Sequence, residues 1–326
     1  MTIDVDDAYT AARLHAMRGR LLKAAEYERL MRMSDAEVLS QLQASAYRQD
    51  VDALGVRDLD DLEALDRVIA RNSDRTLSSL AHIVSPRFAP LIDELHRAND
   101  AWNVRVAAEG IAGGTGAAHA LETFARPGMY AVAPLGAAKT LEELKRVAAK
   151  RYPAIGRAGD TLAEILDALE RIRAQQPLPK DGSGALLADE RNISRALRCA
   201  RDHIPIDRAL AGMSAGGTLS RAVLRALASA KDIPDALRIL GTTRYREAAT
   251  RALTAGTDAP LRIEAEVHRA VLRALARLSR ADPLGPGILA RYVAERGIEA
   301  VNLRLLVKAK RLGLDEAFVR ERLVVN

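Results

Sequence analysis

The stretch Thr161-Leu-Ala-Glu-Ile-Leu-Asp-Ala-Leu-Glu-Arg-Ile-Arg173 predicts the fold class of this chain. Its apolar residues recur at the spacing of one face of an α-helix, and they are Leu162, Ile165, Leu166, Leu169 and Ile172. Thr161 and Glu164 form a capping box, in which a hydroxyl and a carboxylate satisfy free backbone N–H groups of the first turn. We therefore predict an amphipathic helix that begins after Thr161.

The same two signals recur along the chain. The stretch from Asp61 to Val84 repeats the helical spacing of apolar residues. Two further pairs have the capping-box spacing, Ser34 with Glu37 and Thr140 with Glu143. Hydrophobic residues make up 48% of the 326 residues and aromatic residues only 3%, a composition that favours helices over strands. The sequence therefore predicts an all-α fold with a substantial core.

Several classes of site are excluded by composition. Cys199 is the single cysteine, so neither an internal disulfide nor a thiolate zinc cluster can form. Cys199 lies beside Arg198 and Arg201, which can lower a thiol pKa, but the simpler interpretation is a small residue within a helix. The six histidines lack the spacing of a metal site, and no uncharged stretch approaches the ~20 residues of a membrane helix. We expect no metal, no cofactor and no membrane span.

Two short matches to catalytic motifs fail in context. Gly212-Met-Ser214-Ala-Gly216 fits the G-x-S-x-G elbow of hydrolases, but a helical pattern precedes it where the elbow needs a strand. Gly136-Ala-Ala-Lys139-Thr140 resembles the end of a phosphate-binding loop, yet Ala138 stands where that loop needs glycine. We expect a chain without catalytic residues of its own.

A stripe of arginines follows helical spacing in the C-terminal third of a chain with a net charge of +6. It consists of Arg262, Arg269, Arg273, Arg277 and Arg280. A solvated helix face is the first interpretation, and a contact with another protein is the second. Nucleic acid is the least favoured partner, because the stripe lacks the aromatic residues on which bases stack.

Three copies of one pattern place an acid three residues before an asparagine and an arginine two or three residues after it. The copies are Asp100, Asn103 and Arg105; Asp189, Asn192 and Arg195; and Glu299, Asn302 and Arg304. An amide beside an apolar stripe can bond to the backbone of a neighbouring helix and fix how the two dock. We predict that the three asparagines occupy equivalent places in three related helical domains. Gly- and Pro-rich breaks place these domains at residues 1–125, 126–212 and 213–326.

A family resemblance combines these helices with motifs at both ends of the chain. These are Tyr9-Thr-Ala-Ala-Arg13-Leu-His-Ala-Met-Arg18-Gly-Arg-Leu-Leu22, Asp282-Pro-Leu-Gly-Pro-Gly287, Asn302-Leu-Arg304 and Gly313-Leu314. In this order they resemble the C subunits of vacuolar/archaeal-type rotary ATPases, which are named with the letter d in the eukaryotic vacuolar enzymes. The resemblance runs from Tyr9 to Leu323 and departs from the pattern at Ser194, which stands where the other copies have arginine.

This resemblance implies a funnel of three helical domains around a pseudo-threefold axis. It implies a non-catalytic rotor subunit, one copy within a hetero-oligomeric complex, on the cytoplasmic face of the membrane. Its partners would be the central-stalk subunits and the membrane rotor ring, and Arg273, Arg277 and Arg280 are our candidates for a charged contact with the ring. The alternative is a helical-repeat scaffold unrelated to rotary ATPases, which copurification would distinguish.

Overall fold

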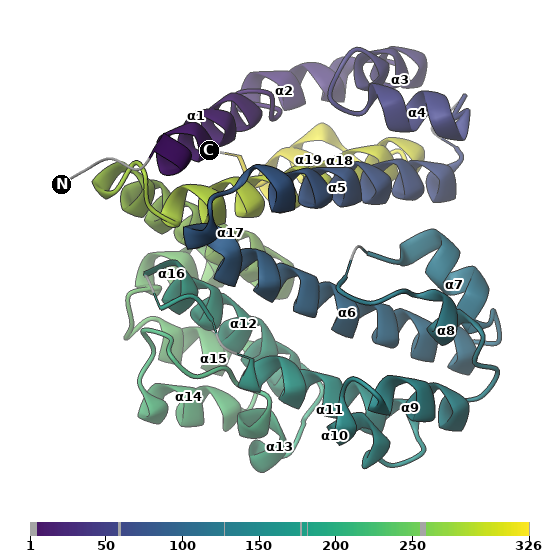
Figure 1. Ribbon diagram of the computed structural model, residues 1–326. Coiled ribbons are helices and arrows are strands. Elements are labelled where there is room, and N and C mark those ends of the chain that lie inside the picture. Colours follow the sequence, from purple (N-terminus) through teal and green to yellow (C-terminus); the bar gives the residue numbers. More distant parts are fainter. Residues whose placement is uncertain are drawn as a thin grey trace.

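The computed structural model describes residues 5–57, 60–126, 128–176, 178–180, 182–254 and 259–325. Every regular element within these ranges is helical, which confirms the predicted all-α class (Figure 1). The chain starts with α1 (Val5–Arg18), and a short 3-10 turn, η1 (Pro86–Phe88), lies near the middle of its first half.

The remaining helices form three groups with the same order of elements, a long helix, a short helix and then four more. The first group is α6 (Ala89–Ala112), α7 (Ala117–Phe124), α8 (Ala133–Gly136), α9 (Leu141–Ala149), α10 (Pro153–Gly156) and α11 (Leu162–Gln175). The second is α12 (Gly182–Arg201), α13 (Ile206–Ala211), α14 (Arg221–Ala228), α15 (Ile233–Leu240), α16 (Arg246–Leu253) and α17 (Ala259–Ala281). The third group takes its long and short helices from the C-terminal end, α18 (Gly287–Arg311) and α19 (Glu316–Arg322). Its other four helices come from the N-terminal end, and they are α2 (Ala24–Arg32), α3 (Asp35–Gln43), α4 (Arg48–Leu54) and α5 (Leu62–Ile83).

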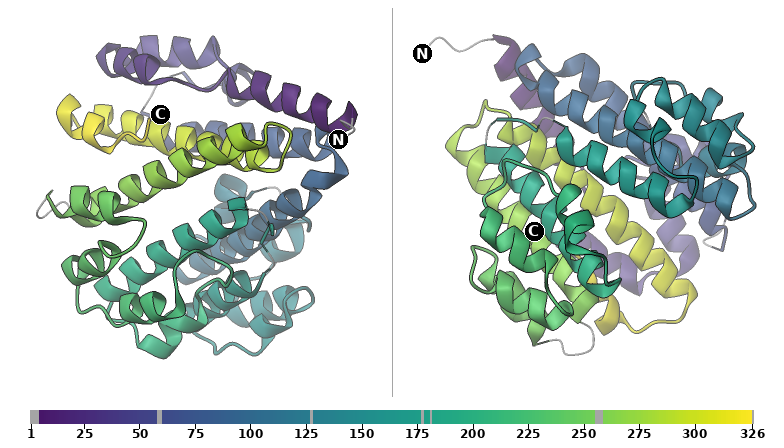
Figure 2. Two further views of the ribbon diagram at one scale, coloured as in Figure 1. Left: turned by 90° about the vertical axis from the view of Figure 1, so that its left-hand side faces the viewer. Right: turned by 90° about the horizontal axis from the view of Figure 1, so that it is seen from below.

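The third group combines the two ends of the chain. One hydrophobic cluster contains buried side chains of α2 to α5 together with those of α18 and α19, including Leu42, Val68 and Leu303. Both views in Figure 2 are coloured by sequence, and the left one shows the purple N-terminal helices above the yellow C-terminal ones. Burial of apolar surface is indifferent to sequence separation, so the two ends can share one core.

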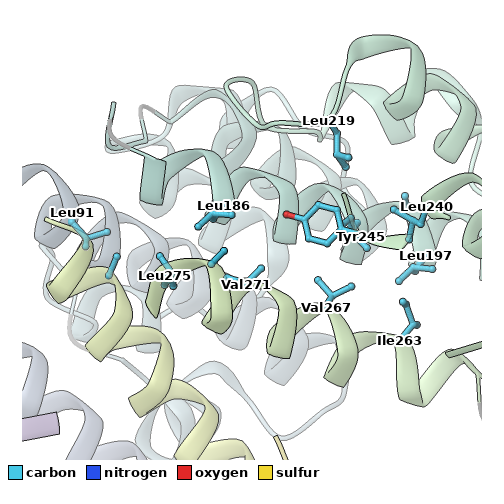
Figure 3. Close-up of a cluster of buried hydrophobic side chains, with 14 of the residues drawn as sticks. Leu91, Leu186, Leu197, Leu219, Leu240, Tyr245, Ile263, Val267, Val271 and Leu275 are labelled. Atoms are coloured by element: carbon cyan, nitrogen blue, oxygen red, sulfur yellow. The ribbon is translucent and has the colours of Figure 1, made fainter. Parts of the chain in front are cut away.

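The other two groups each have a hydrophobic cluster. The cluster of the first group spans α6 to α11 and includes Val104, Leu144 and Ile165. The cluster of the second surrounds Tyr245, whose ring lies among apolar side chains of α12, α15 and α17 (Figure 3). This second cluster also contains Leu91 of α6 and other residues of α1, α5 and α18, so it joins the three groups where the long helices begin.

The domain boundaries expected near residues 125 and 213 cut across these clusters. The first-group cluster has members on both sides of residue 125, because α6 packs against α9 and α11. Residues before and after 213 likewise share the cluster around Tyr245. Hydrophobic packing thus joins helices on the two sides of each expected boundary, and the three domains with these bounds stay a prediction.

Local capping determines where several helices begin. Thr161 with Glu164 and Ser34 with Glu37 both form the complete reciprocal capping box. Thr140 accepts a hydrogen bond from the Glu143 backbone N–H at 3.2 Å, as predicted. The Glu143 carboxylate, however, accepts from the backbone N–H of Lys139 at 2.8 Å, so this third box is only half formed.

Candidate functional site

Two of the three pattern asparagines bind a backbone segment in the same way. The Asn103 amide donates to the Arg126 carbonyl at 2.8 Å, and its oxygen accepts from the Arg126 N–H at 2.7 Å. Asn192 does the same with Ser214, at 2.9 and 2.7 Å. In each case the bound residue lies in the loop that follows the short helix, α7 or α13.

The third asparagine repeats the arrangement at the C-terminal end of the chain. Asn302 donates to the Val324 carbonyl at 2.8 Å and accepts from the Val324 N–H at 3.1 Å. Asn302 is 1% exposed, so its amide satisfies a backbone donor and acceptor that water does not reach. Each long helix therefore anchors the segment after its short helix through one amide.

The acid three residues before each asparagine caps the loop that follows. Asp100 accepts from the backbone N–H groups of Met129 at 3.2 Å and Tyr130 at 3.3 Å. Burial raises the pKa of Asp100, and these two N–H groups oppose the rise. Asp189 accepts from the N–H groups of Thr218 at 2.7 Å and Leu219 at 3.1 Å. A carboxylate that receives several backbone N–H groups holds a loop more tightly than a neutral acceptor does.

In the third copy the acid reaches across to the other end of the chain. Glu299 of α18 accepts from the backbone N–H of Leu22 at 2.5 Å, although the two residues are 277 positions apart. Burial raises the pKa of Glu299, while Arg296 and the Leu22 N–H oppose the rise. Leu22 lies just before α2, as Leu219 lies just before α14. The acid of the third copy therefore binds the equivalent backbone position, although here the acid and the bound residue come from opposite ends of the chain.

Two glycines make room for the acids. A Cβ atom on Gly128 would lie 1.9 Å from the Asp100 carboxylate, and one on Gly217 would lie 2.4 Å from the Asp189 carboxylate. Real Cβ atoms do not approach an oxygen so closely, so the loop can receive the carboxylate only where no side chain intervenes.

Two tyrosines that the sequence analysis missed complete these sites. The Tyr245 hydroxyl donates to Asp189 at 2.9 Å, and the Tyr47 hydroxyl donates to Glu299 at 3.0 Å. Their surroundings share a recognisable pattern, Leu42-Gln-Ala-Ser-Ala-Tyr47-Arg48 and Leu240-Gly-Thr-Thr-Arg-Tyr245-Arg246, which was the available signal. Tyr152 precedes α10 as the other two precede α4 and α16, but its buried hydroxyl has no hydrogen-bond partner among the described residues.

The three pattern arginines have different roles. Arg105 pairs with Glu109 one turn along its own helix at 2.9 Å, and Arg304 pairs with Asp66 of α5 at 2.7 Å. Arg195 donates to two carbonyls at the end of α13, Ala209 at 2.9 Å and Arg208 at 2.7 Å. The one-residue shift of Arg195 thus directs it to a short helix that the other two do not contact.

A central cavity of about 530 Å³ lies between the long helices. Helices α6, α11, α12, α17 and α18 line it. Its apolar wall is formed mainly by Leu91, Leu95, Ala98, Ala290, Val293, Ala294, Ile298 and Val301 of α6 and α18. Its charged residues are Glu94, Arg126, Glu170, Arg173, Glu190, Arg191, Arg198, Glu264 and His268. The lining of this cavity therefore offers both an apolar surface and charged groups.

A second cavity of about 280 Å³ adjoins the first and shares Leu95, Asn99 and Arg126 with it. We call it the side cavity; helices α5, α6 and α18 supply most of its lining. Asp74 of α5 lies in its wall with one carboxylate oxygen buried and unpartnered. Burial raises the pKa of Asp74 to about 7, with Asp50 adding to the rise and Arg126 and Arg71 opposing it.

The arginine stripe lies on α17, away from the central cavity. Arg273, Arg277 and Arg280 are exposed, and Arg273 is 3.9 Å from Glu247 of α16. Arg269 is different, because it donates to the carbonyls of Leu323 and Glu321 beside the C-terminal segment. The outer part of the stripe is thus available to a partner, while Arg269 helps to hold the chain end.

The rejected serine motif lies in a connecting segment, whereas the rejected phosphate-loop motif starts at Gly136, the last residue of α8. Ser214 is 4% exposed in the loop between α13 and α14, where its backbone binds Asn192. Cys199 is buried within α12, and burial raises its thiol pKa against the opposing effect of Arg195 and Arg198. Within the described ranges no group of three His, Cys, Asp or Glu side chains is arranged to hold a metal ion. No helix of that part of the chain is long and apolar enough to cross a membrane.

Comparison with known proteins gives one consistent family. The family model described as ATP synthase (C/AC39) subunit matches residues 10–175 and 185–322. The C subunit of an A-type ATP synthase from Haloferax volcanii is 25% identical, with 97% of each chain covered. The C subunit of a V-type ATP synthase from Thermus thermophilus is 27% identical, with 98% of each chain covered.

Proposed function

The chain belongs to the ATP synthase (C/AC39) subunit family, and from that membership we propose that it is a non-catalytic rotor subunit of a rotary ATPase or ATP synthase. In this role it couples the central stalk to the membrane ion-translocating ring. The observation that carries the proposal is the family match, which covers nearly the whole length of the chain and of its relatives.

The central cavity is the proposed seat of the stalk. Its apolar wall includes Val301, which is 54% exposed on α18 although valine is ordinarily a core residue. Together with Leu95 and Val293 of the same lining, Val301 makes an apolar surface on which another molecule can dock. We propose a funnel-like arrangement in which the three groups surround the end of the stalk.

Torque transmission requires a body that does not bend, and the anchored loops supply this stiffness. Each long helix holds its following loops by an asparagine and an acid, both buried among polar partners that they satisfy. Fully satisfied buried networks are rigid, because each bond broken leaves an uncompensated polar group. The contact between Glu299 and Leu22 extends this bracing across the two chain ends.

The ring is the proposed second partner. A pseudo-threefold body cannot match every subunit of a ring with more copies, so this contact must tolerate mismatch. Charge–charge attraction varies slowly with position, whereas close packing does not. The exposed residues Arg273, Arg277 and Arg280 are the candidate charged contact, and the protein would lie on the cytoplasmic face of the membrane without entering it.

Copurification tests this function. We expect an affinity-tagged copy expressed in the native organism to bring down both catalytic head subunits and ring subunits in fixed stoichiometry. Deletion of the chain should leave ATP hydrolysis by the head intact while ATP-driven ion pumping is lost. If the tagged chain recovers neither group of subunits, the proposal is wrong, and the alternative of a helical-repeat scaffold unrelated to rotary ATPases is favoured.

A further inference from the structure

Arg173 of α11 is a cation without a counter-ion in the wall of the central cavity. It has no hydrogen bond or ion pair in the part of the chain that the structure describes, and its Nε is buried without an acceptor. Arg191 of α12 lies in the same wall, and its Nη1 is also buried without a partner. Two guanidinium N–H groups of residues that line this cavity therefore lack acceptors among the described residues.

The nearby carboxylates are already engaged. Glu94 of α6 is 1% exposed and pairs with Arg191 through the Nη2 atom. Glu170 lies 3.8 Å from Arg195 and 3.6 Å from Arg198. Glu94 and Glu170 are thus paired with other arginines, and neither forms an ion pair with Arg173.

The surroundings of Arg173 disfavour its charge. Burial lowers the pKa of Arg173, and Arg191 and Arg198 lower it further, while Glu170 and Glu94 act in the opposite direction. Arginine nevertheless keeps its proton in proteins, because its guanidinium group is the most basic of the side chains. A buried cation that cannot lose its charge is a destabilising feature unless an anion arrives to pair with it.

We propose that the polypeptide segment that occupies the central cavity presents a carboxylate, from an aspartate, a glutamate or a chain end, to Arg173 and Arg191. This inference rests on the proposed function, which supplies the stalk as occupant, and it adds the chemistry of the contact. The planar guanidinium group binds carboxylate oxygens in a two-pronged geometry, so one acid can pair with the charge of Arg173.

The apolar part of the lining favours a polypeptide over a free anion. Leu95, Val293 and Val301 line the same cavity as the arginines, and a lone phosphate or acetate ion would leave them uncovered. A segment with an apolar face and one carboxylate covers these side chains and neutralises Arg173 together. Arg173 then acts as a positioning residue that sets the rotational register of the inserted segment.

Binding and stability measured on the same variants test this contact. The binding partner is the soluble head-and-stalk subcomplex purified from the same organism and immobilised through one of its catalytic chains, and the full chain is titrated onto it. We expect Arg173→Gln to weaken binding at least about tenfold, because the buried carboxylate of the partner loses its counter-ion. Arg173→Glu should weaken binding more, because it places two negative charges together. The matched control is Arg157→Gln, which removes an exposed charge that lines neither cavity.

Thermal unfolding of the free chain separates this role from a structural one. Because Arg173 is unpaired, Arg173→Gln should unfold at the same temperature as the wild type or at a higher one. A scan of lysine substitutions at acidic positions of the stalk tip should include one that restores binding to Arg173→Glu. If Arg173→Gln binds as well as Arg157→Gln, or if its loss of binding comes with a lower unfolding temperature, the carboxylate contact is wrong. A wild-type chain that fails to bind the subcomplex would instead overturn the proposed function.

Discussion

The Tyr245 hydroxyl lies 2.9 Å from the Asp189 carboxylate, and these two buried side chains are separated by 56 residues in sequence. The Tyr245 ring packs among Leu219, Leu240 and Val267 (Figure 3), and its hydroxyl end reaches the acid that caps the loop before α14. Burial raises the pKa of Tyr245, and the neighbouring Asp189 charge raises it further, so the hydroxyl stays a donor at all working pH values.

Removal of this hydroxyl should destabilise the protein. We expect Tyr245→Phe to lower the free energy of unfolding by about 1–3 kcal/mol, because Asp189 loses a donor in a site that water does not enter. Tyr152→Phe is the control, since the buried Tyr152 hydroxyl has no hydrogen-bond partner in the part of the chain that the structure describes, and its loss should cost nothing. Denaturant unfolding of both variants measures the difference, and equal effects would contradict the assigned role of Tyr245.

Loss of an anchoring amide should loosen one loop. Asn192→Ala leaves both the N–H and the carbonyl of Ser214 buried without partners, so we expect a loss of about 2–4 kcal/mol. Hydrogen exchange of the Ser214 amide should accelerate beyond that of α12 itself. Ser194→Ala, two residues along the same helix, serves as the control and should leave both quantities unchanged.

A loop glycine and a helix glycine should tolerate substitution unequally. Gly217→Ala should cost about 1–3 kcal/mol, because the new Cβ meets the Asp189 carboxylate at 2.4 Å. Gly297→Ala should instead stabilise the protein by about 0.5–1 kcal/mol, since nothing lies within 4 Å of its Cβ and alanine favours a helix interior. Opposite shifts in the unfolding temperature are the expected result. Shifts of the same sign would mean that the Asp189 site is less crowded than described.

Asp74 should make stability fall as pH rises. Burial raises its pKa from 3.8 to about 7, so the folded chain holds a proton that the unfolded chain releases. The stabilising contribution is complete below pH 3.8, declines as pH rises and is lost above about 7. We expect Asp74→Asn to match the wild type near pH 4 and to exceed its stability at pH 8. The gain should be about 1–2 kcal/mol, after discounting for partial solvent screening. Parallel pH curves for the two proteins would contradict the raised pKa.

Reversal of the outer stripe should affect coupling more than folding. Arg273, Arg277 and Arg280 are exposed, so their joint change to Glu should leave the unfolding temperature nearly unchanged. We expect ATP-driven pumping to fall relative to ATP hydrolysis at low salt, because the charged contact with the ring is reversed. The wild type should approach the variant as salt rises and screening shortens to ~8–10 Å or less. Normal assembly and coupling at low salt would remove the stripe from the interface.

The positions of several helices could be predicted from the local sequence. Helix α11 begins after Thr161 and contains the apolar stripe predicted for it, and the capping bond from Glu164 spans three residues. Such bonds depend on spacing along one turn, so the sequence determines them without knowledge of the rest of the chain. The half-formed box at Thr140 marks the limit, since the Glu143 carboxylate binds the backbone N–H of Lys139 in place of that of Thr140.

Only tertiary structure decided what the repeated residues bind and how the ends meet. The sequence alone shows that Asn103, Asn192 and Asn302 share one pattern. The backbone groups that they bind lie 22 or 23 residues further along the chain, a separation that helical periodicity does not predict. Glu299 contacts Leu22, which lies 277 positions away in the sequence, and no local sequence pattern predicts that contact. The physical reason is that capping and periodicity act within a few residues, whereas the burial of apolar surface joins whichever helices fit, including those at opposite ends of the chain.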